Sequence, residues 1–271
     1  MMILLTGGTG LVGSRLLKRF AEAGIDCRAL VRPGKELPAG VTATEGDILS
    51  PGSLTSAVEG VSAVVHLAAV FRTRDDAEIW RVNLEGTRNL IAAVKNHAPE
   101  ARFIMASTSN VYNPDSSHPG REDDAVAPTL AYPASKIMAE NELRESGLTW
   151  SILRLPFVYG DKDGHLESAP AQLAEMKWHP AQKLSVVHHA DIATAFELAL
   201  TGAMDGRIVN IADEAPLTIY EIAQIVGSAY ESSAEPLANP WRGHMDVTLA
   251  RRLGFQPKVA TVYQAIREGR L

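Results

Sequence analysis

Residues 6–13 read Thr6-Gly7-Gly8-Thr9-Gly10-Leu11-Val12-Gly13, and this glycine turn lies between the apolar run Met2–Leu5 and an amphipathic run from Val12 to Ala23. The order predicts a buried strand, a tight loop and a helix that begins at the last glycine. Unpaired backbone N–H groups and the positive end of a helix dipole then meet at one point. Such a point attracts phosphate.

The glycines of this turn have separable roles. Gly7 allows a sharp exit from the strand, Gly10 removes a Cβ that would keep a pyrophosphate from the backbone, and Gly13 lets helix and strand pack closely. Glycine turns after a first strand also occur without a ligand. The helix that follows, and a second strand about 20 residues further on, favour a dinucleotide site.

The composition indicates an ordinary globular protein of 271 residues, of which 46% are hydrophobic. Lys and Arg number 26 against 32 Asp and Glu, no basic run occurs, and nucleic acid is therefore not expected as a partner. The single Cys27 cannot form an internal disulfide, and no Cys/His cluster has zinc spacing. No apolar run approaches the roughly 18 residues of a membrane span, and Met1–Leu5 resembles a strand more than a signal peptide. We expect a cytoplasmic protein without a metal.

Apolar runs that alternate with helical patterns predict an α/β fold, a Rossmann-type doubly wound parallel sheet with a small, mainly helical C-terminal substrate lobe. Further strands are expected at Cys27–Val31, Val41–Glu45, Ala63–Leu67, Arg102–Ala106, Trp150–Leu155 and Arg207–Ile211, and helices at Trp80–Val94, Tyr132–Glu145, Ile192–Leu200 and Ile219–Val226. The dinucleotide-binding domain is expected over residues 1–160, completed by a strand near 207–211 and a helix over 190–201. Residues 161–189 and 212–271 then form the small lobe.

Arg32 stands where the second expected strand leaves the sheet. A carboxylate at that place accepts a hydrogen bond from the adenosine ribose, whereas an arginine pairs with a 2′-phosphate. Asp26 is at the wrong end of the strand, so NADP is preferred over NAD, although a solvated loop arginine is the alternative. Asp47, after the third strand, either accepts from an adenine amino group or caps a following helix.

A hydroxyl cluster and a Tyr/Lys pair supply the candidate chemistry. Tyr132 and Lys136 are four residues apart and share one helical face, and Thr108 ends the fifth expected strand. A free phenol has a pKa of about 10, and a cation beside it favours the phenolate. A surface Tyr/Lys pair is the alternative. Asn83 either satisfies a neighbouring carbonyl or holds a water or a lysine near the site.

Taken together, these stretches resemble the extended short-chain dehydrogenase/reductases, also called the NAD(P)-dependent epimerase/dehydratase family. The resemblance covers most of the chain. It rests on the glycine turn, Gly46-Asp47, His66-Leu67-Ala68-Ala69, Val82-Asn83-Leu84-Glu85-Gly86-Thr87, Ser107-Thr108-Ser109-Asn110-Val111-Tyr112, Tyr132 with Lys136, and Arg154-Leu155-Pro156-Phe157-Val158-Tyr159-Gly160.

The resemblance implies that Tyr132 is the catalytic acid/base, that Lys136 holds the nicotinamide ribose and lowers the proton affinity of the phenol, and that Thr108 is the catalytic Ser/Thr. Asn83 joins this set. The implied cofactor-binding residues are Gly7, Thr9, Gly10, Leu11, Val12, Gly13, Arg32, Asp47, Ile48, Leu67, Ala68, Ala69, Tyr132, Lys136, Pro156 and Val158. A homodimer through the helices Trp80–Val94 and Tyr132–Glu145 is also implied.

Departures from the family pattern narrow the expected substrate. Asn113-Pro114 follows Tyr112 in place of the usual glycine. The connection from Gly160 to His188 is short, and shortly before His188 it offers only Lys183, where sugar-nucleotide members often carry an arginine that pairs with the diphosphate. A compact pocket without a diphosphate clamp is therefore expected. Its expected substrate-binding residues are Phe71, Arg72, Asn110, Phe157 and His188, with His165, Trp178 and Trp241 as further candidates.

The sequence thus favours a reductase or dehydrogenase acting on a small ketone, aldehyde or secondary alcohol. A sugar or sugar-nucleotide epimerase/dehydratase is the alternative, although Ser109-Asn110 replaces the Asp-Glu pair that similar dehydratases carry after the catalytic Thr. A non-catalytic dinucleotide-sensing regulator is the second alternative, and such proteins typically lack the Tyr/Lys pair. His188 and His189 do not predict a metal site, because adjacent residues of a strand point to opposite faces.

Overall fold

The seven strands expected from the apolar runs form one parallel sheet in the computed structural model, which describes residues 1–271. The strands are β1 (Ile3–Thr6), β2 (Cys27–Val31), β3 (Thr42–Glu45), β4 (Ala63–His66), β5 (Arg102–Thr108), β6 (Trp150–Leu155) and β10 (Arg207–Asn210). Their order is β10-β6-β5-β4-β1-β2-β3, so the chain reverses direction across the sheet between β1 and β4. Ligands of such sheets bind beside the carboxyl ends of the strands at this reversal.

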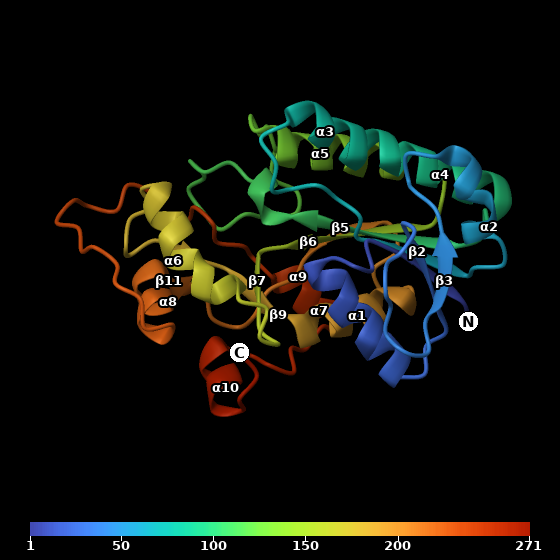
Figure 1. The fold of residues 1–271 in the computed structure, drawn as a ribbon. Helices are drawn as coiled ribbons and strands as arrows, with labels where there is room; N and C mark the ends of the chain where they lie inside the picture. Colours follow the sequence, from blue (N-terminus) through green and yellow to red (C-terminus); the bar gives the residue numbers. More distant parts are fainter.

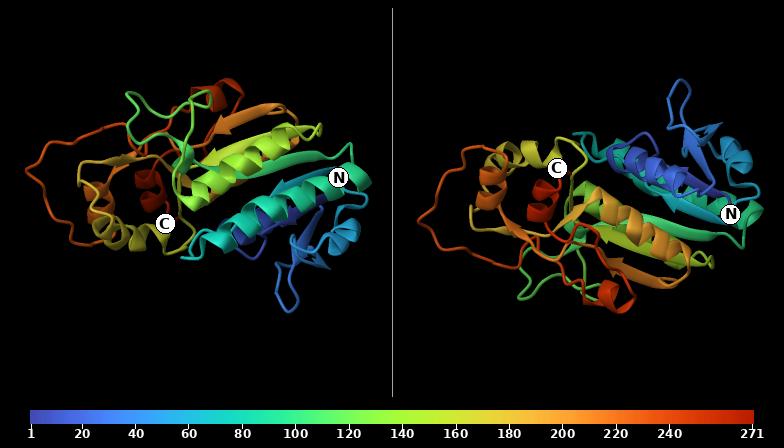
Figure 2. Two further views of the ribbon diagram at one scale, coloured as in Figure 1. Left: turned by 90° about the horizontal axis from the view of Figure 1, so that it is seen from above. Right: turned by 90° about the horizontal axis from the view of Figure 1, so that it is seen from below.

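Helices cover both faces of the sheet, as Figure 1 shows. Figure 2 presents the two helical layers, one in each view. One layer holds α3 (Asp76–Trp80), α4 (Gly86–His97) and α5 (Ala131–Arg144), with the short α2 (Thr55–Val58) beside α4, and the other holds α1 (Leu11–Glu22) and α7 (His189–Leu200). Alternate residues of β1 serve the two layers, since Leu5 packs in the core with Phe20 and Leu4 packs in the core with Leu90. The burial of both faces explains why the central strands β1 and β4 are largely apolar, whereas the edge strand β3 is mostly exposed and polar.

The expected helix over Trp80–Val94 is interrupted. A π-helical turn at Arg81–Glu85 joins α3 to α4, and Thr87 Oγ1 donates a hydrogen bond to the carbonyl oxygen of Asn83. Such turns interrupt α-helices at functional sites. Single 3-10 turns occur at Pro51–Ser53 and Ser109–Val111.

Four short strands lie outside the main sheet. Of their residues, only His188 is expected on a strand from the sequence, and His189, expected there too, begins α7. β7 (Phe157–Tyr159) pairs in parallel with β9 (Val186–His188), and β8 (Lys183–Leu184) pairs antiparallel with β11 (Leu217–Thr218). Strands of two or three residues are too short to show a periodicity. The lobe helices are α6 (His165–Glu175), α8 (Ile219–Ile225) and α10 (Val262–Arg267), and they lie at one end of the molecule (Figure 1).

One part of the expected lobe packs on the sheet instead. The short helix α9 (Thr248–Arg252) contacts β10, and Ala250 and Phe255 lie fully buried in the cluster that contains Phe196 and Val209. The aromatic ring of Phe255 finds its apolar surroundings there and not against the lobe. The division of the chain at residue 160 and the dimer through α4 and α5 stay predictions. None of the helices is both long and apolar enough to cross a membrane.

Candidate active site

The glycine turn between β1 and α1 is closed on one side and open on the other. Gly7 has φ +75°, and a Cβ there would lie 2.7 Å from the backbone nitrogen of Ala68. A Cβ on Gly13 would overlap the carbonyl group of Gly7, whereas a Cβ on Gly10 meets only Gly7 O, at 3.3 Å. Gly7 and Gly13 are therefore required by the fold, and Gly10 faces open space.

The beginning of α1 is available to an anion. Gly10 is its N-cap, and because it has no side chain it gives no capping hydrogen bond to the first turn. The N–H groups of Leu11 and Val12 and the positive end of the helix dipole are thus free to meet a phosphate. A cradle that a Cβ would fill at Gly10, with uncapped N–H groups beside it, fits a dinucleotide pyrophosphate.

Other expected cofactor-binding residues lie at the same edge of the sheet, since each follows the carboxyl end of a parallel strand. Arg32 is exposed after β2, and Leu67, Ala68 and Ala69 follow β4. Asp47 Oδ1 accepts a hydrogen bond from Leu49 N at 2.8 Å, so the carboxylate makes a local turn.

Ile48 lies buried after β3, where a Cβ on Gly86 would come 2.6 Å from its Cδ1 atom. Thr9 is exposed in the glycine turn, and Pro156 and Val158 follow β6. The structure therefore gathers the expected cofactor residues at one edge, as the strand ends predict.

Tyr132, Lys136 and Thr108 also come together. The pKa of Tyr132 is raised to about 12 by burial, and a hydrogen bond from Thr108 opposes that rise. Lys136 is buried one turn further along α5, and burial lowers its pKa to about 8. The expected lowering of the phenol pKa by Lys136 is not found, because the loss of hydration dominates. Near neutral pH the phenol is protonated and the lysine is charged.

Lys136 is a buried cation without an acidic partner of its own. The nearest carboxylate, Glu140, pairs with Arg154 at 2.7 Å. A buried ammonium costs stability unless hydrogen-bond acceptors surround it. Ribose hydroxyl groups would supply such acceptors, so Lys136 also fits a dinucleotide.

Lys136→Met is therefore expected to raise the free energy of unfolding of the ligand-free chain at pH 7 by about 3 kcal/mol, since each unit of pKa shift corresponds to about 1.4 kcal/mol. Its folded pKa lies below its unfolded value, so the penalty is full below about pH 8 and vanishes as pH rises through about 10.4. Urea unfolding at pH 7 and pH 10 measures the gain and its decline. The exposed Lys95→Met is the control, and equal stability of both variants at pH 7 would contradict the expectation.

Asn83 does not reach the reacting groups. Its Oδ1 accepts from Val70 N at 2.7 Å, and its Nδ2 donates to Val70 O at 3.0 Å and to Ser135 Oγ at 3.1 Å. The assignment of Asn83 to the catalytic residues is therefore corrected, because its amide is consumed by the backbone of the β4–α3 loop. It fixes that loop to α5, and Phe71 in the same loop lies with its ring centroid 4.4 Å from that of Tyr132.

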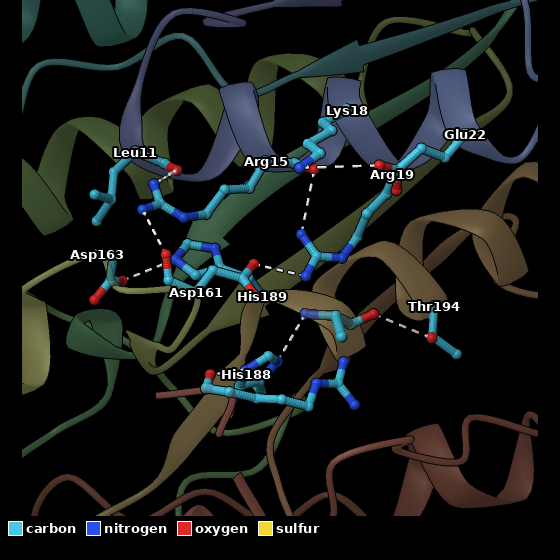
Figure 3. Close-up of polar contacts among 12 residues, drawn as sticks. Leu11, Arg15, Lys18, Arg19, Glu22, Asp161, Asp163, His188, His189 and Thr194 are labelled. Atoms are coloured by element: carbon cyan, nitrogen blue, oxygen red, sulfur yellow. Dashed lines mark hydrogen bonds and ion pairs between the residues drawn. The ribbon is translucent and has the colours of Figure 1, made fainter. Parts of the chain in front are cut away.

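His188 is not a substrate-binding residue in this structure. The ring is fully buried, its Nδ1 accepts from Ala190 N at 3.0 Å, and its Nε2 donates to Arg270 O at 2.9 Å. It caps α7 and ties down the C-terminal residues. The neighbouring His189 pairs with Asp163 at 2.8 Å (Figure 3). The expectation that His188 binds substrate was wrong, because the local sequence does not reveal that its side chain is buried.

The remaining pocket candidates separate into two groups. Phe71, Arg72 and Asn110 are exposed, and Phe157 stacks on His165 with centroids 4.2 Å apart. Trp178 instead lies under Arg242 at 4.4 Å, and Trp241 stacks on His244. Both tryptophans thus serve contacts with the 242–244 segment.

The sequence reasoning missed a buried polar network beneath α5. Glu140 accepts from Arg154 Nε and Nη2 at 3.1 and 2.7 Å and from Ser107 Oγ. Arg154 Nη1 also donates to Tyr112 OH at 3.0 Å, and that hydroxyl donates to Asn210 Oδ1 at 2.6 Å. The available signal was Glu140 itself, four residues after Lys136 on the same face of the helix.

A cavity of about 660 Å³ lies along the outer face of α1 and not at this site. Its arginines are already engaged, since Arg19 pairs with Asp161 at 2.6 Å and Arg15 donates to two backbone carbonyl groups (Figure 3). None of the expected catalytic residues lines it.

Comparison with known proteins gives a family match over most of the chain. The model of the NAD dependent epimerase/dehydratase family matches residues 3–212. A ketoreductase of Stigmatella aurantiaca that acts on a farnesyl-dihydroquinoline oxide is 28% identical, over 98% of this chain and 86% of its own length. The GDP-6-deoxy-D-mannose reductase of Pseudomonas aeruginosa is 27% identical, over 89% of this chain and 84% of its own.

Solved structures share the fold. UDP-glucose 4-epimerase of Thermotoga maritima, determined with UDP-glucose, superposes with a TM-score of 0.80 at 23% identity, covering 98% of this chain and 96% of that one. A short-chain dehydrogenase/reductase superfamily protein of Agrobacterium tumefaciens with bound NAD gives the same score and identity, with 99% and 95% coverage.

Proposed function

Because the chain belongs to the NAD dependent epimerase/dehydratase family and is an enzyme of the short-chain dehydrogenase/reductase type, we propose that it is an NADP-dependent oxidoreductase of small carbonyl compounds and secondary alcohols. One observation carries the proposal. A protonated Tyr132, whose pKa the Thr108 hydroxyl lowers against burial and which lies one helical turn from a charged Lys136, stands at the sheet edge that also carries the open glycine turn.

The proposed cofactor site uses residues that follow the carboxyl ends of the parallel strands. The N–H groups after Gly10 receive the pyrophosphate, Lys136 holds ribose hydroxyl groups, and Asp47 with Ile48 lies beside the adenine. Leu67, Ala68, Ala69 and the loop from Pro156 to Val158 line the rest. When bound, the nicotinamide supplies or accepts the hydride.

Tyr132 supplies the proton in the direction of reduction. As the carbonyl carbon gains a hydride, its oxygen takes the proton of the phenol, and the product is an alcohol with Tyr132 left as phenolate. Thr108 donates a hydrogen bond to the same oxygen, and the Lys136 ammonium stabilises the phenolate until it regains a proton. In oxidation the same groups act in reverse.

The proposal prefers reduction of a simple carbonyl group over sugar epimerisation. Ser109-Asn110 directly after Thr108 lacks the carboxylates for a dehydration, and the cation that stands shortly before β9 is Lys183 and not an arginine. Two relatives that match over most of the chain are named as a ketoreductase and a reductase, and a third, matched over 96% of it, is named as a dTDP-glucose 4,6-dehydratase.

Oxidation of NADPH by the purified protein, followed over a panel of ketones and aldehydes, tests the proposal. Turnover of at least one compound is expected, with none for UDP-glucose under the same conditions. Interconversion of UDP-sugars without net NADPH consumption would indicate the epimerase. Binding of NADPH with no turnover of any carbonyl compound would indicate the sensing regulator.

Arg32→Asp is expected to shift the preference from NADPH toward NADH by tenfold or more, because it replaces the guanidinium that faces a 2′-phosphate with a carboxylate that accepts from a 2′-hydroxyl. Dissociation constants for both cofactors, measured by fluorescence titration, give the ratio. Arg252→Asp, an equally exposed position at the end of α9, is the control. An unaltered ratio would refute the 2′-phosphate assignment.

A further inference from the structure

His165 is held with one ring nitrogen committed to the protein. Its Nδ1 lies 2.8 Å from the carbonyl oxygen of Val158. A carbonyl oxygen only accepts hydrogen bonds, so the proton of the neutral ring is on Nδ1 and Nε2 keeps a lone pair. No group of the chain donates to that lone pair.

The ring is also fixed in orientation. It stacks on Phe157 with a centroid distance of 4.2 Å and an interplanar angle of 20°. Its backbone N–H donates to Asp163 Oδ1 at 2.8 Å, at the first residue of α6. An acceptor that the protein fixes in this way loses little entropy when it binds a donor.

The position of His165 connects it to the reacting groups. Phe157 and Val158 belong to β7, which begins two residues after β6 ends, at the carboxyl edge of the sheet. The charge of Arg72 reaches the imidazole, and the adjacent Phe71 lies 4.4 Å from Tyr132. The segment Phe71-Arg72 thus links His165 on one side with Tyr132 on the other.

Burial and the nearby positive charges together keep the His165 ring neutral. Burial lowers the pKa of His165 most, and the positive charges of Arg72 and His189 lower it further. The carbonyl of Val158 and the carboxylate of Asp163 act in the opposite direction but do not restore the ordinary value. The lone pair on Nε2 is thus available near neutral pH.

We propose that His165 Nε2 accepts a hydrogen bond from a hydroxyl group of the substrate, so that the enzyme takes hydroxylated carbonyl compounds in preference to plain alkyl ketones and aldehydes. The reacting carbonyl is itself an acceptor and cannot satisfy this nitrogen. A hydroxyl group of the substrate next to that carbonyl can donate a hydrogen bond to Nε2. The inference rests on the proposed oxidoreductase function and adds the chemistry of its substrate.

Acetoin and butanone, which differ by one hydroxyl group, test this subsite. His165→Phe keeps an aromatic ring for Phe157 and removes the acceptor. We expect KM for acetoin to rise about tenfold with kcat nearly unchanged, since one hydrogen bond is worth about 1.5 kcal/mol, and KM for butanone to stay the same. His165→Gln, whose amide oxygen accepts a hydrogen bond, is expected to recover part of the loss. Equal effects on both ketones, or none, would overturn the subsite.

A second readout does not depend on turnover. Nitrogen NMR of histidine-labelled protein is expected to show His165 as the Nδ1–H tautomer, with its Nε2 signal shifting on addition of acetoin but not of butanone. The control is His97→Phe, at an exposed position at the end of α4. The Nε2 signal that shifts with acetoin is expected to remain in this variant and to be lost in His165→Phe. If no ketone is reduced but the shift occurs, the oxidoreductase proposal fails and the subsite stands. If ketones are reduced and neither the shift nor the KM effect occurs, the subsite fails alone.

Discussion

Tyr132→Phe is expected to lower kcat for carbonyl reduction by about 100- to 10,000-fold, the range that a positioned acid contributes. The phenol is protonated near neutral pH because its pKa is about 12, so the native enzyme holds the proton that reduction consumes. Phenylalanine keeps the ring contact with Phe71 and removes only the hydroxyl group.

Steady-state NADPH oxidation with the best carbonyl compound of the panel measures this loss, and fluorescence titration confirms that NADPH still binds. Tyr220→Phe in α8 is the control, since that ring is 46% exposed and its hydroxyl group contacts only Gln224. If Tyr132→Phe retains the native rate, Tyr132 is not the acid, and trace turnover equal in both proteins would favour the sensing regulator.

Glu140→Ala is expected to lower the free energy of unfolding by about 3–5 kcal/mol, because it leaves the Arg154 guanidinium buried without its counter-charge. Glu140 and Arg154 are 2% and 3% exposed and are 2.7 Å apart. The neighbouring carboxylate holds the pKa of Arg154 above its usual range, so this arginine cannot escape the cost by losing a proton.

The same helix provides a matched control. Glu142 pairs with Arg88 at 2.6 Å, but these side chains are 36% and 47% exposed. Glu142→Ala is therefore expected to cost less than about 1 kcal/mol. Urea unfolding of both variants gives the comparison. A double variant, Glu140→Leu with Arg154→Met, is expected to regain most of the stability, and equal losses for the two single variants would contradict this account of the buried pair.

Loss of Glu140 also bears on Lys136, since the carboxylate raises the lysine pKa against the effect of burial. The network continues through Tyr112 to Asn210, whose Nδ2 donates to the carbonyl oxygens of Gly120 and Asp246. Helix α5 is thus tied to the segment after β5 and to the end of β10. We expect substitutions in this network to change activity by shifting Tyr132 and Lys136 on α5, although the network residues do not themselves contact the substrate.

The amino-acid sequence by itself determined the features that depend on local order. Apolar runs set the strands of the sheet, the spacing of Gly7 and Gly13 set the turn, and Tyr132 and Lys136 share a face because four residues make about one helical turn. Parallel strands end at one edge, so residues that follow them come together without further information.

Tertiary structure alone decided which polar side chains are free. His188 and Asn83 look like site residues in the sequence, yet the carbonyl groups of Arg270 and Val70 occupy them. His165 lies free at Nε2 only because Val158 takes Nδ1. The partner of His188 lies 82 residues away along the chain and leaves no periodic signal, because it is set by how the C-terminal residues pack and not by the chain near His188. The same packing, through burial, raised the pKa of Tyr132 where a lysine nearby led us to expect a decrease.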